Sequence, residues 1–555
     1  EELLAFLMSN DMGVVNEGNK PTFWSSRGNE VIDLTLAKTG IMDDIQGWRV
    51  TEEQTLSDHR MIRFSMRDYA EQGQSARRNV RHTDWGLFKK TLEEELAKRG
   101  RKEDVEGAVK DLNEALKISF EQSTALKEPS RKKSEPGWTK EVKELFNKAK
   151  RALRKAWRKG GTAWEAVRPA ERAFRKALRK AKGESWRSFC SEAETVPAAT
   201  RIFKIAGGSK IKAPVAIRRE DGSFCVTPEE SLEQLMLAHF PVAEKPLERI
   251  KEFERMELPP GLITKDKVRA AIASFGPYKA PGTDGIYPIM LQKGGEEVIA
   301  KLAGIYRSCL RYGYVPEPWQ EVRVVFIPKP GKMDNSDPKA VRPICLTSFM
   351  MKGLERILDW YIRDNCLQHR LLHPAQYAYR RGIGTETALH QLVSRLEKTV
   401  IDDGQLALAT FTDIQGAFSN VFLDKMSECM DTFEVPDSVS AWIRTMLRNR
   451  TVTTMFGGVI AEGPVQRGTP QGGVLSPLTW LMVMDSLLRI LEKELPGVYK
   501  QAWSDDLVLV VTGTDPSTLR DIMQLALRIV SKWALEMGLS INPKKSEAVV
   551  FTLRR

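Results

Sequence analysis

Apolar residues in the second half of the chain follow the patterns of buried strands and helices. Leu406–Thr412 and Leu507–Val511 are short aliphatic runs, which predict buried strands. Leu478–Leu491 has the apolar spacing of a helix, and Asp266–Phe275 predicts another helix, capped near Thr264. Strands and helices therefore mix in this half, as in a globular domain with its own core.

The first half has a different pattern. Leu87–Leu126 is polar and amphipathic with helical spacing, and a linker is predicted at Glu128–Gly137. Lys140–Arg187 is rich in alanine and basic residues and also predicts helices, whereas residues 195–260 mix short strands and turns. We therefore divide the 555 residues into three parts, namely 1–68, 69–260 and 261–555.

Three carboxylates lie at the ends of the two predicted strands. Asp413 follows the first strand, and the pair Asp505-Asp506 precedes the second, after Ser504. Adjacent carboxylates at a turn suit hard divalent cations, and two-metal sites use them to clamp the oxygens of an in-line displacement. The alternative for the pair alone is an ordinary acidic turn.

The loop Gly468–Pro477 lies between these carboxylates along the chain. It reads Gly-Thr-Pro-Gln-Gly-Gly-Val-Leu-Ser-Pro and leads into the predicted helix at Leu478. The glycines after Gln471 allow the backbone to approach a ligand closely. The alternative is a plain junction between a loop and a helix.

Together these elements resemble motifs A, B and C of reverse transcriptases in order and spacing. Asp413 with Phe418 resembles motif A, the loop resembles motif B, and the Asp pair resembles motif C. Further segments resemble the polymerases of non-LTR retrotransposons, and the resemblance runs from about Lys279 to the last residue. These segments are Lys279–Gly285, Trp319–Lys332, Val341–Leu346, Gln376–Gly382 and Gly538–Glu547.

The resemblance implies an α+β fold, a right-hand palm and fingers. It also implies Mg²⁺ (or Mn²⁺) at the active site, held by carboxylates and a backbone carbonyl. The implied catalytic residues and metal ligands are Asp413, Asp505 and Asp506, with the carbonyl of Ile414 as a further ligand.

Other residues match the nucleotide-binding positions of the family. Phe418 matches an aromatic gate against the ribose 2′-hydroxyl, although a core aromatic is the alternative. Lys329 and Arg342 match residues that neutralise the triphosphate. Gln471 and Gly472 match the loop that contacts the incoming nucleotide. Lys545 matches a proton donor to pyrophosphate, and the neighbouring Lys544 is the competing assignment.

Four positions depart from the usual motifs. Trp503 and Ser504 precede the Asp pair, where Tyr is usual two residues before it, Ser419 replaces an Asp found in many relatives, and Leu481 replaces a common Asn. None of these changes removes a metal ligand, so they affect fine kinetics and not the class of reaction.

The N-terminus carries a second, independent resemblance. The segments around Asp33 and Ser57-Asp58-His59 are similar to the last strands of the apurinic-endonuclease-like nuclease domain. The resemblance implies that His59 acts at a scissile phosphate and that a carboxylate, from Asp33 on the strand Ile32–Leu34, orients its imidazole. We expect residues 1–68 to be a partial four-layer α/β nuclease remnant without its metal-binding Glu. We also expect the chain to be a fragment that lacks the thumb.

Charge adds a candidate partner. Lys140–Arg187 contains 17 Lys and Arg against 5 Asp and Glu, and its excess equals the +12 of the whole chain. Because aromatic residues are interspersed, we predict a nucleic-acid-binding segment that includes Arg151, Arg154, Lys155 and Arg158. The alternative is a pair of solvated amphipathic helices whose aromatic residues pack on neighbours.

The six cysteines form no metal-binding pattern, no apolar run approaches a membrane span, and the acidic opening Glu-Glu-Leu-Leu is unlike a signal peptide. We therefore expect an intracellular protein, nuclear and cytoplasmic.

The leading hypothesis is an RNA-directed DNA polymerase of a non-LTR, jockey-like retrotransposon, with RNA template, DNA primer or target site and dNTPs as partners. The alternative is a non-catalytic nucleic-acid-binding remnant or domesticated copy. The nuclease-like N-terminus disfavours an intron maturase or a telomerase-like polymerase.

Overall fold

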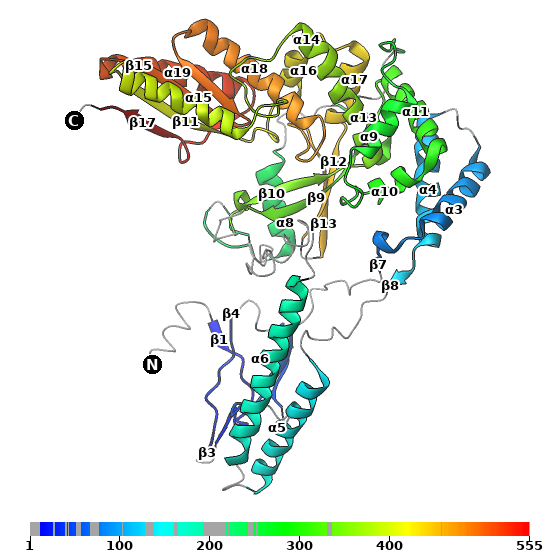
Figure 1. Ribbon diagram of the computed structural model, residues 1–555, viewed down its shortest axis with the longest axis vertical. Coiled ribbons are helices and arrows are strands. Elements are labelled where there is room, and N and C mark those ends of the chain that lie inside the picture. The colour runs from blue at the N-terminus through cyan, green and yellow to red at the C-terminus, as the bar shows by residue number, and fades with distance from the viewer. Residues whose placement is uncertain are drawn as a thin grey trace. The chain divides into compact units, whose positions relative to one another are not determined.

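The computed structural model describes residues 12–66, 77–127, 138–191, 217–250 and 254–553, apart from short gaps at 26–27, 39–41, 43, 52–56, 101, 103, 160–164, 220, 226, 242–247, 330–335 and 457. It separates into two compact units (Figure 1). The first contains Glu1–Ser75 and Glu128–Lys212, and the second Ala76–Lys127 and Ala213–Arg555. The predicted linker Glu128–Gly137 lies outside the described residues.

Short antiparallel pairs of strands make up the N-terminal part of the first unit. A small core of Val15, Ala37, Trp48 and Val50 holds this part together. The prediction of a strand at Ile32–Leu34 was wrong, because these residues connect two strands without forming one. The pairs are β1 (Met12–Val14) with β4 (Leu36–Lys38), β2 (Phe23–Ser25) with β3 (Gly28–Glu30), and β5 (Ile45–Val50) with β6 (Ile62–Met66).

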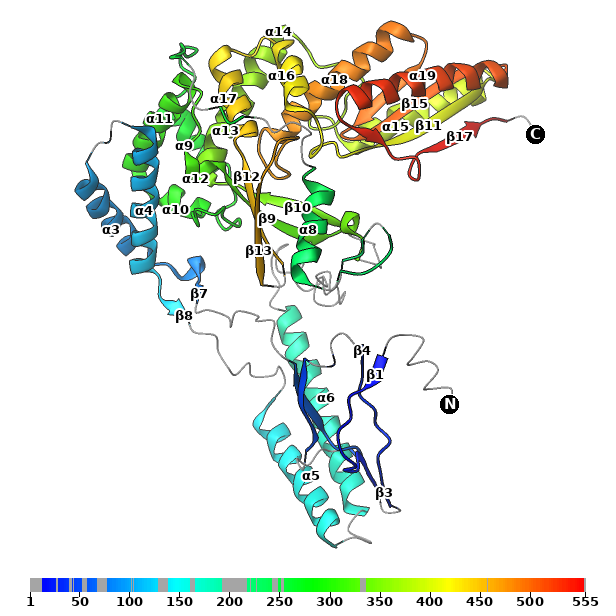
Figure 2. The same cartoon turned by 180° about the vertical axis from the view of Figure 1, so that it is seen from behind.

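Two long helices complete the first unit, α5 (Lys140–Lys159) and α6 (Val167–Ser191), and they pack side by side (Figures 1 and 2). Trp138, Phe146 and Phe174 contact one another at ring-centroid distances of 5.4–6.2 Å. These three rings therefore serve the packing between the helices, which is the alternative that the sequence left open for the aromatic residues. Most basic residues of the two helices are exposed.

The second unit begins earlier than the sequence predicted. The helices α3 (Trp85–Arg99) and α4 (Val105–Ser123) share the large core of this unit through Phe88, Leu112 and Leu116. They pack against each other, and α4 packs on α11 (Gly295–Arg311). The boundary placed at residue 261 misses them, because the helical pattern alone did not indicate on what these helices pack. Two short strands, β7 (Arg77–Arg78) and β8 (Leu126–Lys127), and the 3₁₀ turn η1 (Val80–His82) flank them.

A four-stranded sheet, which we call the fingers sheet, has the order β10-β9-β12-β13. β9 and β12 run parallel, and the other neighbours are antiparallel. The helix α8 (Pro228–His239) packs on β12 and β13. The strands are β9 (Glu321–Pro328), β10 (Val341–Leu346), β12 (Thr451–Phe456) and β13 (Val459–Pro464).

A second sheet, which we call the palm sheet, has the order β14-β15-β11-β16, and β17 also pairs with β11. Its central strand β11 (Leu406–Gln415) is largely buried, as its aliphatic sequence predicts. The long helix α19 (Pro516–Glu536) packs on β11 and β15, as Figures 1 and 2 show. The other strands are β14 (Tyr499–Trp503), β15 (Asp506–Gly513), β16 (Ser540–Ile541) and β17 (Glu547–Phe551).

Helices surround these sheets and bury the core, which includes Trp319, Trp442, Trp480 and Trp533. The predicted cap is confirmed, because the Thr264 hydroxyl accepts a hydrogen bond from the Lys267 amide at 3.2 Å. The remaining helices are α9 (Lys265–Ala273), α10 (Pro288–Lys293), α12 (Glu317–Gln320), α13 (Phe349–Tyr361), α14 (Leu367–His369), α15 (Thr385–Glu397), α16 (Leu423–Asp431), α17 (Asp437–Arg448) and α18 (Ser476–Glu494), with short 3₁₀ or π segments η3 (Pro338–Ala340), η4 (Ile362–Cys366) and η5 (Lys398–Asp402).

The architecture is the predicted α+β class, with sheets and helices packed together in the second unit. Within the described residues, no helix has both the length and the apolar character that crossing a bilayer requires. All six cysteines are unpaired, and five of them are buried.

Candidate active site

The three candidate carboxylates come together on the palm sheet. Asp413 on β11 lies directly opposite Asp506 on β15 in the antiparallel register. Asp505 lies in the turn between β14 and β15, and its carbonyl accepts a hydrogen bond from the Ile414 amide at 3.2 Å. Directly opposed residues on antiparallel strands project from the same face. Asp506 is therefore the cross-strand partner of Asp413, an assignment that the sequence did not make.

The turn that presents the acids is held by two aromatic residues. Ser504 adopts a positive φ of 59° and is buried. Its carbonyl accepts a hydrogen bond from Trp480 Nε1 at 2.8 Å, and its hydroxyl lies 3.3 Å from the Tyr379 hydroxyl. The departure from the usual motif at Ser504 is thus accommodated by contacts that fix the turn.

Lys545 and Asn542 contact Asp413 from the segment before β17. Lys545 Nζ lies 3.2 and 3.1 Å from the two carboxylate oxygens, and Asn542 Nδ2 lies 3.3 Å from one of them. The Lys544 amide instead donates to Asn542 Oδ1. The structure therefore brings Lys545, and not Lys544, to the acids. Sequence reasoning missed Asn542, for which its position just before Pro543 in a turn was the available signal.

The charges of this region influence one another. Partial burial raises the pKa of Asp506, and the negative charges of Asp505 and Asp413 raise it further. Burial also lowers the pKa of the Lys329 ammonium, with further lowering from the positive charges of Lys545 and Arg342. Carboxylates and cationic side chains thus lie close enough to influence one another. Such an arrangement suits a multiply charged anion together with its counter-cations.

A divalent cation fits the chemistry of the side chains in this region. Three carboxylates repel one another there, and a lysine ammonium lies between the oxygens of Asp413. Within the part of the chain that the structure describes, however, no group of three His, Cys, Asp or Glu side chains is close enough together to hold a metal ion. The ligand set is therefore present but not assembled.

Lys329 and Arg342 lie on the fingers sheet side of the site. Arg342 is exposed on β10, opposite Ile327 of β9, and Lys329 follows the end of β9. The Lys329 ammonium donates to the Lys339 carbonyl at 2.7 Å. Both cations come from neighbouring strands, as their place in the predicted fingers requires.

The loop with Gln471 and Gly472 packs against β10. The Gln471 carbonyl accepts a hydrogen bond from the Cys345 amide at 2.8 Å. Gly472 has a φ of 116°, and a Cβ atom there would lie 2.9 Å from the Cys345 carbonyl oxygen. Only glycine fits this conformation and this close approach. The loop therefore needs Gly472 for its own packing as well as for any ligand.

Phe418 lies beside this loop, half-buried, with its ring centroid 6.0 Å from that of Trp480. Its carbonyl accepts a hydrogen bond from the Thr469 amide at 2.5 Å. The residue thus joins motif A to the start of the loop, and its ring packs at the edge of the core.

The predicted His–carboxylate pair forms in the first unit. His59 Nδ1 donates to the Asp33 carboxylate, at 2.8 Å from one oxygen. This hydrogen bond lowers the pKa of Asp33. Asp58 has a different role, because its backbone carbonyl accepts from the Trp24 amide at 2.8 Å. The structure therefore shows the predicted contact between Asp33 and His59, and it places no Asp58 carboxylate in that contact.

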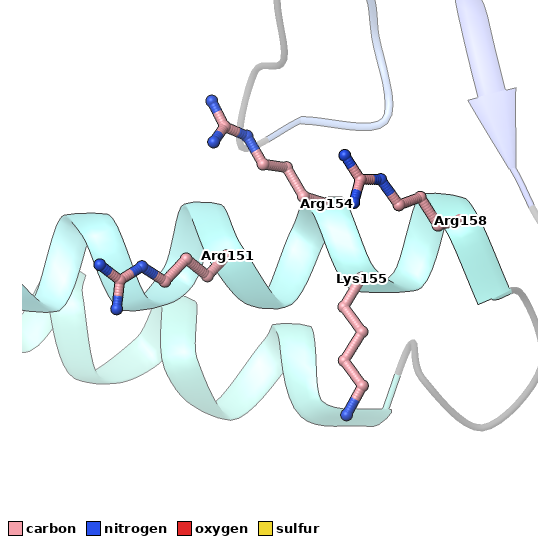
Figure 3. Close-up of a pocket in the computed structure, with 4 residues that line it drawn as sticks. All are labelled: Arg151, Arg154, Lys155 and Arg158. Carbon is pink, nitrogen blue, oxygen red and sulfur yellow. The ribbon is translucent and has the colours of Figure 1, made fainter.

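The four basic residues singled out on α5 line a shallow cavity of about 400 Å³ (Figure 3). Arg151, Arg154, Lys155 and Arg158 are spaced so that they share one side of the helix. All four are exposed. They form a concentrated positive surface, which we call the basic face.

Family comparisons match both ends of the chain. Residues 327–553 match the family described as "Reverse transcriptase (RNA-dependent DNA polymerase)", and residues 1–63 match "Endonuclease-reverse transcriptase".

Individual relatives extend these matches. The Pol polyprotein of the type-1 retrotransposable element R1 of Bradysia coprophila is 26% identical over 98% of this chain and 55% of that protein. The probable RNA-directed DNA polymerase from transposon BS of Drosophila melanogaster is 26% identical over 90% of this chain and 57% of its own length. The polymerase of the mobile element jockey of Drosophila melanogaster is 25% identical over 61% of this chain and 38% of that protein. The chain thus spans about half the length of the first two relatives.

Among solved structures, an apo telomerase from Candida tropicalis shares 11% identity at a TM-score of 0.33, over 43% of this chain and 51% of that chain. The sequence matches are the findings that bear on the family. The chain therefore carries a reverse transcriptase domain behind an endonuclease-type segment, the arrangement of a non-LTR retrotransposon Pol protein.

Proposed function

We propose that this chain is an RNA-directed DNA polymerase that adds dNTPs to a DNA primer during target-primed reverse transcription. The observation that carries the proposal is the placement of Asp413 opposite Asp506, with Asp505 in the adjoining turn, inside the segment that matches reverse transcriptases. A primer 3′-hydroxyl would attack the α-phosphate of a dNTP, and the template would be RNA.

The chain's own residues divide this task. Asp413, Asp505, Asp506 and the Ile414 carbonyl would hold Mg²⁺ (or Mn²⁺), which supplies charge neutralisation for the attacking and leaving oxygens when bound. Lys329 and Arg342 would neutralise the triphosphate, and Gln471 with Gly472 would contact the nucleotide. Lys545 is within reach of the same carboxylate and would donate a proton to the leaving pyrophosphate.

The proposed partners follow from this reaction. A template–primer hybrid would be gripped by its A-form shape and its phosphates, because the 2′-hydroxyls and the backbone distinguish such a duplex. The target site would be chromosomal DNA, which places the protein in the nucleus after synthesis in the cytoplasm. The net charge of +12 favours these polyanionic partners.

A primer-extension assay tests the proposal. The purified chain is incubated with a DNA primer annealed to an RNA template, the four dNTPs and Mg²⁺. Extension that requires Mg²⁺ and the template is expected. A chain that binds the hybrid but adds no nucleotide under any divalent cation would overturn the polymerase assignment.

One observation favours a second candidate, a non-catalytic protein that binds nucleic acid. Lys545 contacts both oxygens of Asp413, and the described residues offer no assembled three-ligand group. A cation-dependent enzyme requires that this contact give way to the metal. The extension assay separates the two candidates, since only the polymerase adds nucleotides.

Phe418 is expected to exclude ribonucleotides. Replacing it with Val or Ala removes the ring beside Trp480, so the 2′-hydroxyl of an rNTP should be admitted. We expect the preference for dNTP over rNTP, measured as the ratio of kcat/KM values, to fall by about tenfold or more. Phe411→Ala is the matched control, because Phe411 is also a partly buried ring of the palm sheet but packs in a separate cluster. An unchanged preference in the Phe418 variants would remove the gate role.

The His59–Asp33 pair is expected to cleave no DNA by itself. It supplies orientation and charge, but the described residues contain no group of ligands for a metal-held nucleophile. Supercoiled plasmid incubated with the chain and Mg²⁺ should therefore remain supercoiled. The amount of nicked plasmid should be the same as with the His59→Ala variant. Nicking that disappears in His59→Ala would show a working nuclease site instead.

A further inference from the structure

The loop that carries Gln471 and Gly472 is fixed at both ends by buried ionisable side chains. At its start lies Arg450, which is 4% exposed. Its guanidinium donates to the carbonyls of Arg467 at 3.1 Å and Gly468 at 2.6 Å, and also to the Leu447 carbonyl at 3.0 Å. The guanidinium thus binds the backbone carbonyls of Arg467 and Gly468, at which the chain enters the loop.

At the end of the loop lies Glu355 of α13, whose side chain has no exposed surface (0%). Its Oε2 accepts hydrogen bonds from the amides of Val474 at 2.7 Å and Leu475 at 3.0 Å. These amides directly precede α18, so the carboxylate lies at the positive end of the helix dipole. Glu355 of α13 therefore caps the N-terminus of α18, which has no capping hydrogen bond from its own N-cap side chain.

Burial makes both groups costly to keep in ionised form. It raises the pKa of Glu355, and it lowers the pKa of Arg450 to about 10. The charge of Glu355 favours the ionised form of Arg450. The hydrogen bonds from the loop amides and the charges of Lys352 and Arg356, in turn, favour the ionised form of Glu355. A serine or water could satisfy the same backbone groups at less cost in desolvation. Two buried ionisable side chains, each hydrogen-bonded to the backbone at one end of the loop, therefore indicate that the structure holds this loop in one position.

The same segment that supplies Glu355 also contacts the middle of the loop. β10 carries Arg342 and Cys345, and α13 with Glu355 follows it after two residues. The Cys345 amide binds the Gln471 carbonyl. Two hydrogen-bonded contacts from one stretch of chain thus fix Gln471 relative to Arg342.

We propose that Glu355 and Arg450 are positioning residues for the nucleotide-binding loop. Neither touches the nucleotide, and both act through the backbone of the loop between Arg467 and Leu475. They hold Gln471 and Gly472 at the distance from Arg342 that an incoming dNTP requires. This inference rests on the proposed polymerase function and names the residues that set its affinity for the nucleotide.

The test uses two conservative variants and one matched control. Glu355→Gln keeps the size and one acceptor oxygen but removes the charge, and Arg450→Lys keeps the charge but removes the fork of donors. The control is Asp485→Asn. Asp485 is also a buried carboxylate of α18 (2% exposed), and it accepts from the His373 amide and from Arg489 Nε, each at 2.6 Å.

Three quantities are measured on each chain: the melting temperature, the hydrogen exchange of the Val474 and Leu475 amides, and the steady-state kinetics with dNTP. We expect Glu355→Gln and Arg450→Lys to raise the KM for dNTP by about 10- to 100-fold, because small displacements of positioning groups have effects of this size. The affinity for the template–primer should stay unchanged. Exchange at Val474 and Leu475 should rise in Glu355→Gln, whereas Asp485→Asn should lower the melting temperature without raising the KM.

Each outcome supports or overturns the positioning role. Unchanged exchange in Glu355→Gln, or raised exchange with an unchanged KM, would overturn it. A KM raised equally by Asp485→Asn would also overturn it, since general destabilisation would then explain the effect. If the unaltered chain extends no primer, the proposed function fails instead, and hydrogen exchange alone decides whether Glu355 orders the loop.

Discussion

Asp505→Asn should abolish primer extension and leave the binding of an RNA–DNA hybrid nearly intact. The substitution keeps the shape of the turn, whose contacts run through Ser504, but it removes a negative charge from the group of Asp413, Asp505 and Asp506. Metal-assisted stabilisation in such sites amounts to several kcal/mol, so we expect a loss of rate on the order of 10³-fold. Single-turnover extension and a separate binding titration measure the two effects.

Asp521→Asn is the control for this experiment. It makes the same substitution on an exposed residue of α19, in contact with Arg520. This variant should extend primers at the rate of the unaltered chain. If Asp505→Asn retains most of the activity while the control behaves as expected, the carboxylates on the palm sheet do not hold the catalytic metal.

The second large effect is expected on the basic face of α5. Replacing Arg151, Arg154, Lys155 and Arg158 together with Gln should weaken binding to nucleic acid of any sequence. Neutralising a phosphate releases counter-ions, so the slope of log affinity against log salt should fall by about one for each phosphate that the variant no longer neutralises. Fluorescence anisotropy between about 50 and 200 mM salt, the range over which phosphate binding is most sensitive to salt, measures the slope.

The matched control replaces four exposed lysines of the second unit with Gln, namely Lys89, Lys90, Lys98 and Lys102. It changes the net charge by the same amount. A steep slope that stays unchanged in the α5 variant, or that falls equally in the control, would mean that the basic face is only a solvated helix surface.

The strands and motifs of the palm sheet could be predicted from the sequence because their signals are local. Leu406–Thr412 and Leu507–Val511 are continuous aliphatic runs, and both are strands in the structure. The acids at their ends come together because antiparallel strands place their neighbouring ends side by side. The match to reverse transcriptases over residues 327–553 agrees with this prediction.

Contacts between distant segments could not be predicted in the same way. The helices α3 and α4 carry an amphipathic pattern, but this pattern does not indicate on what their apolar face packs. In the structure that face packs in the core of the second unit. Glu355 was overlooked for a related reason. A single Glu in an apolar helix gives no sign that its carboxylate reaches the amides of Val474 and Leu475, more than a hundred residues away.

The aromatic residues in and beside the basic helices illustrate an ambiguity that the sequence left open. Trp138, Phe146 and Phe174 are spaced among Lys and Arg, which is equally typical of stacking on bases and of helix packing. Composition cannot separate the two, because both uses need flat, apolar rings. Only the ring contacts between the helices decide in favour of packing.

The backbone at Ser504 restricts which substitutions this turn can accept during evolution. A positive φ at the first position of a two-residue hairpin favours glycine and penalises β-branched residues, in which a second Cβ substituent crowds the chain. Burial against Trp480 and Tyr379 also excludes large side chains. We therefore expect small, unbranched residues such as Gly, Ala, Ser and Asn to be favoured at position 504. A Val or Ile at this position would strain the backbone of the turn and lower its stability.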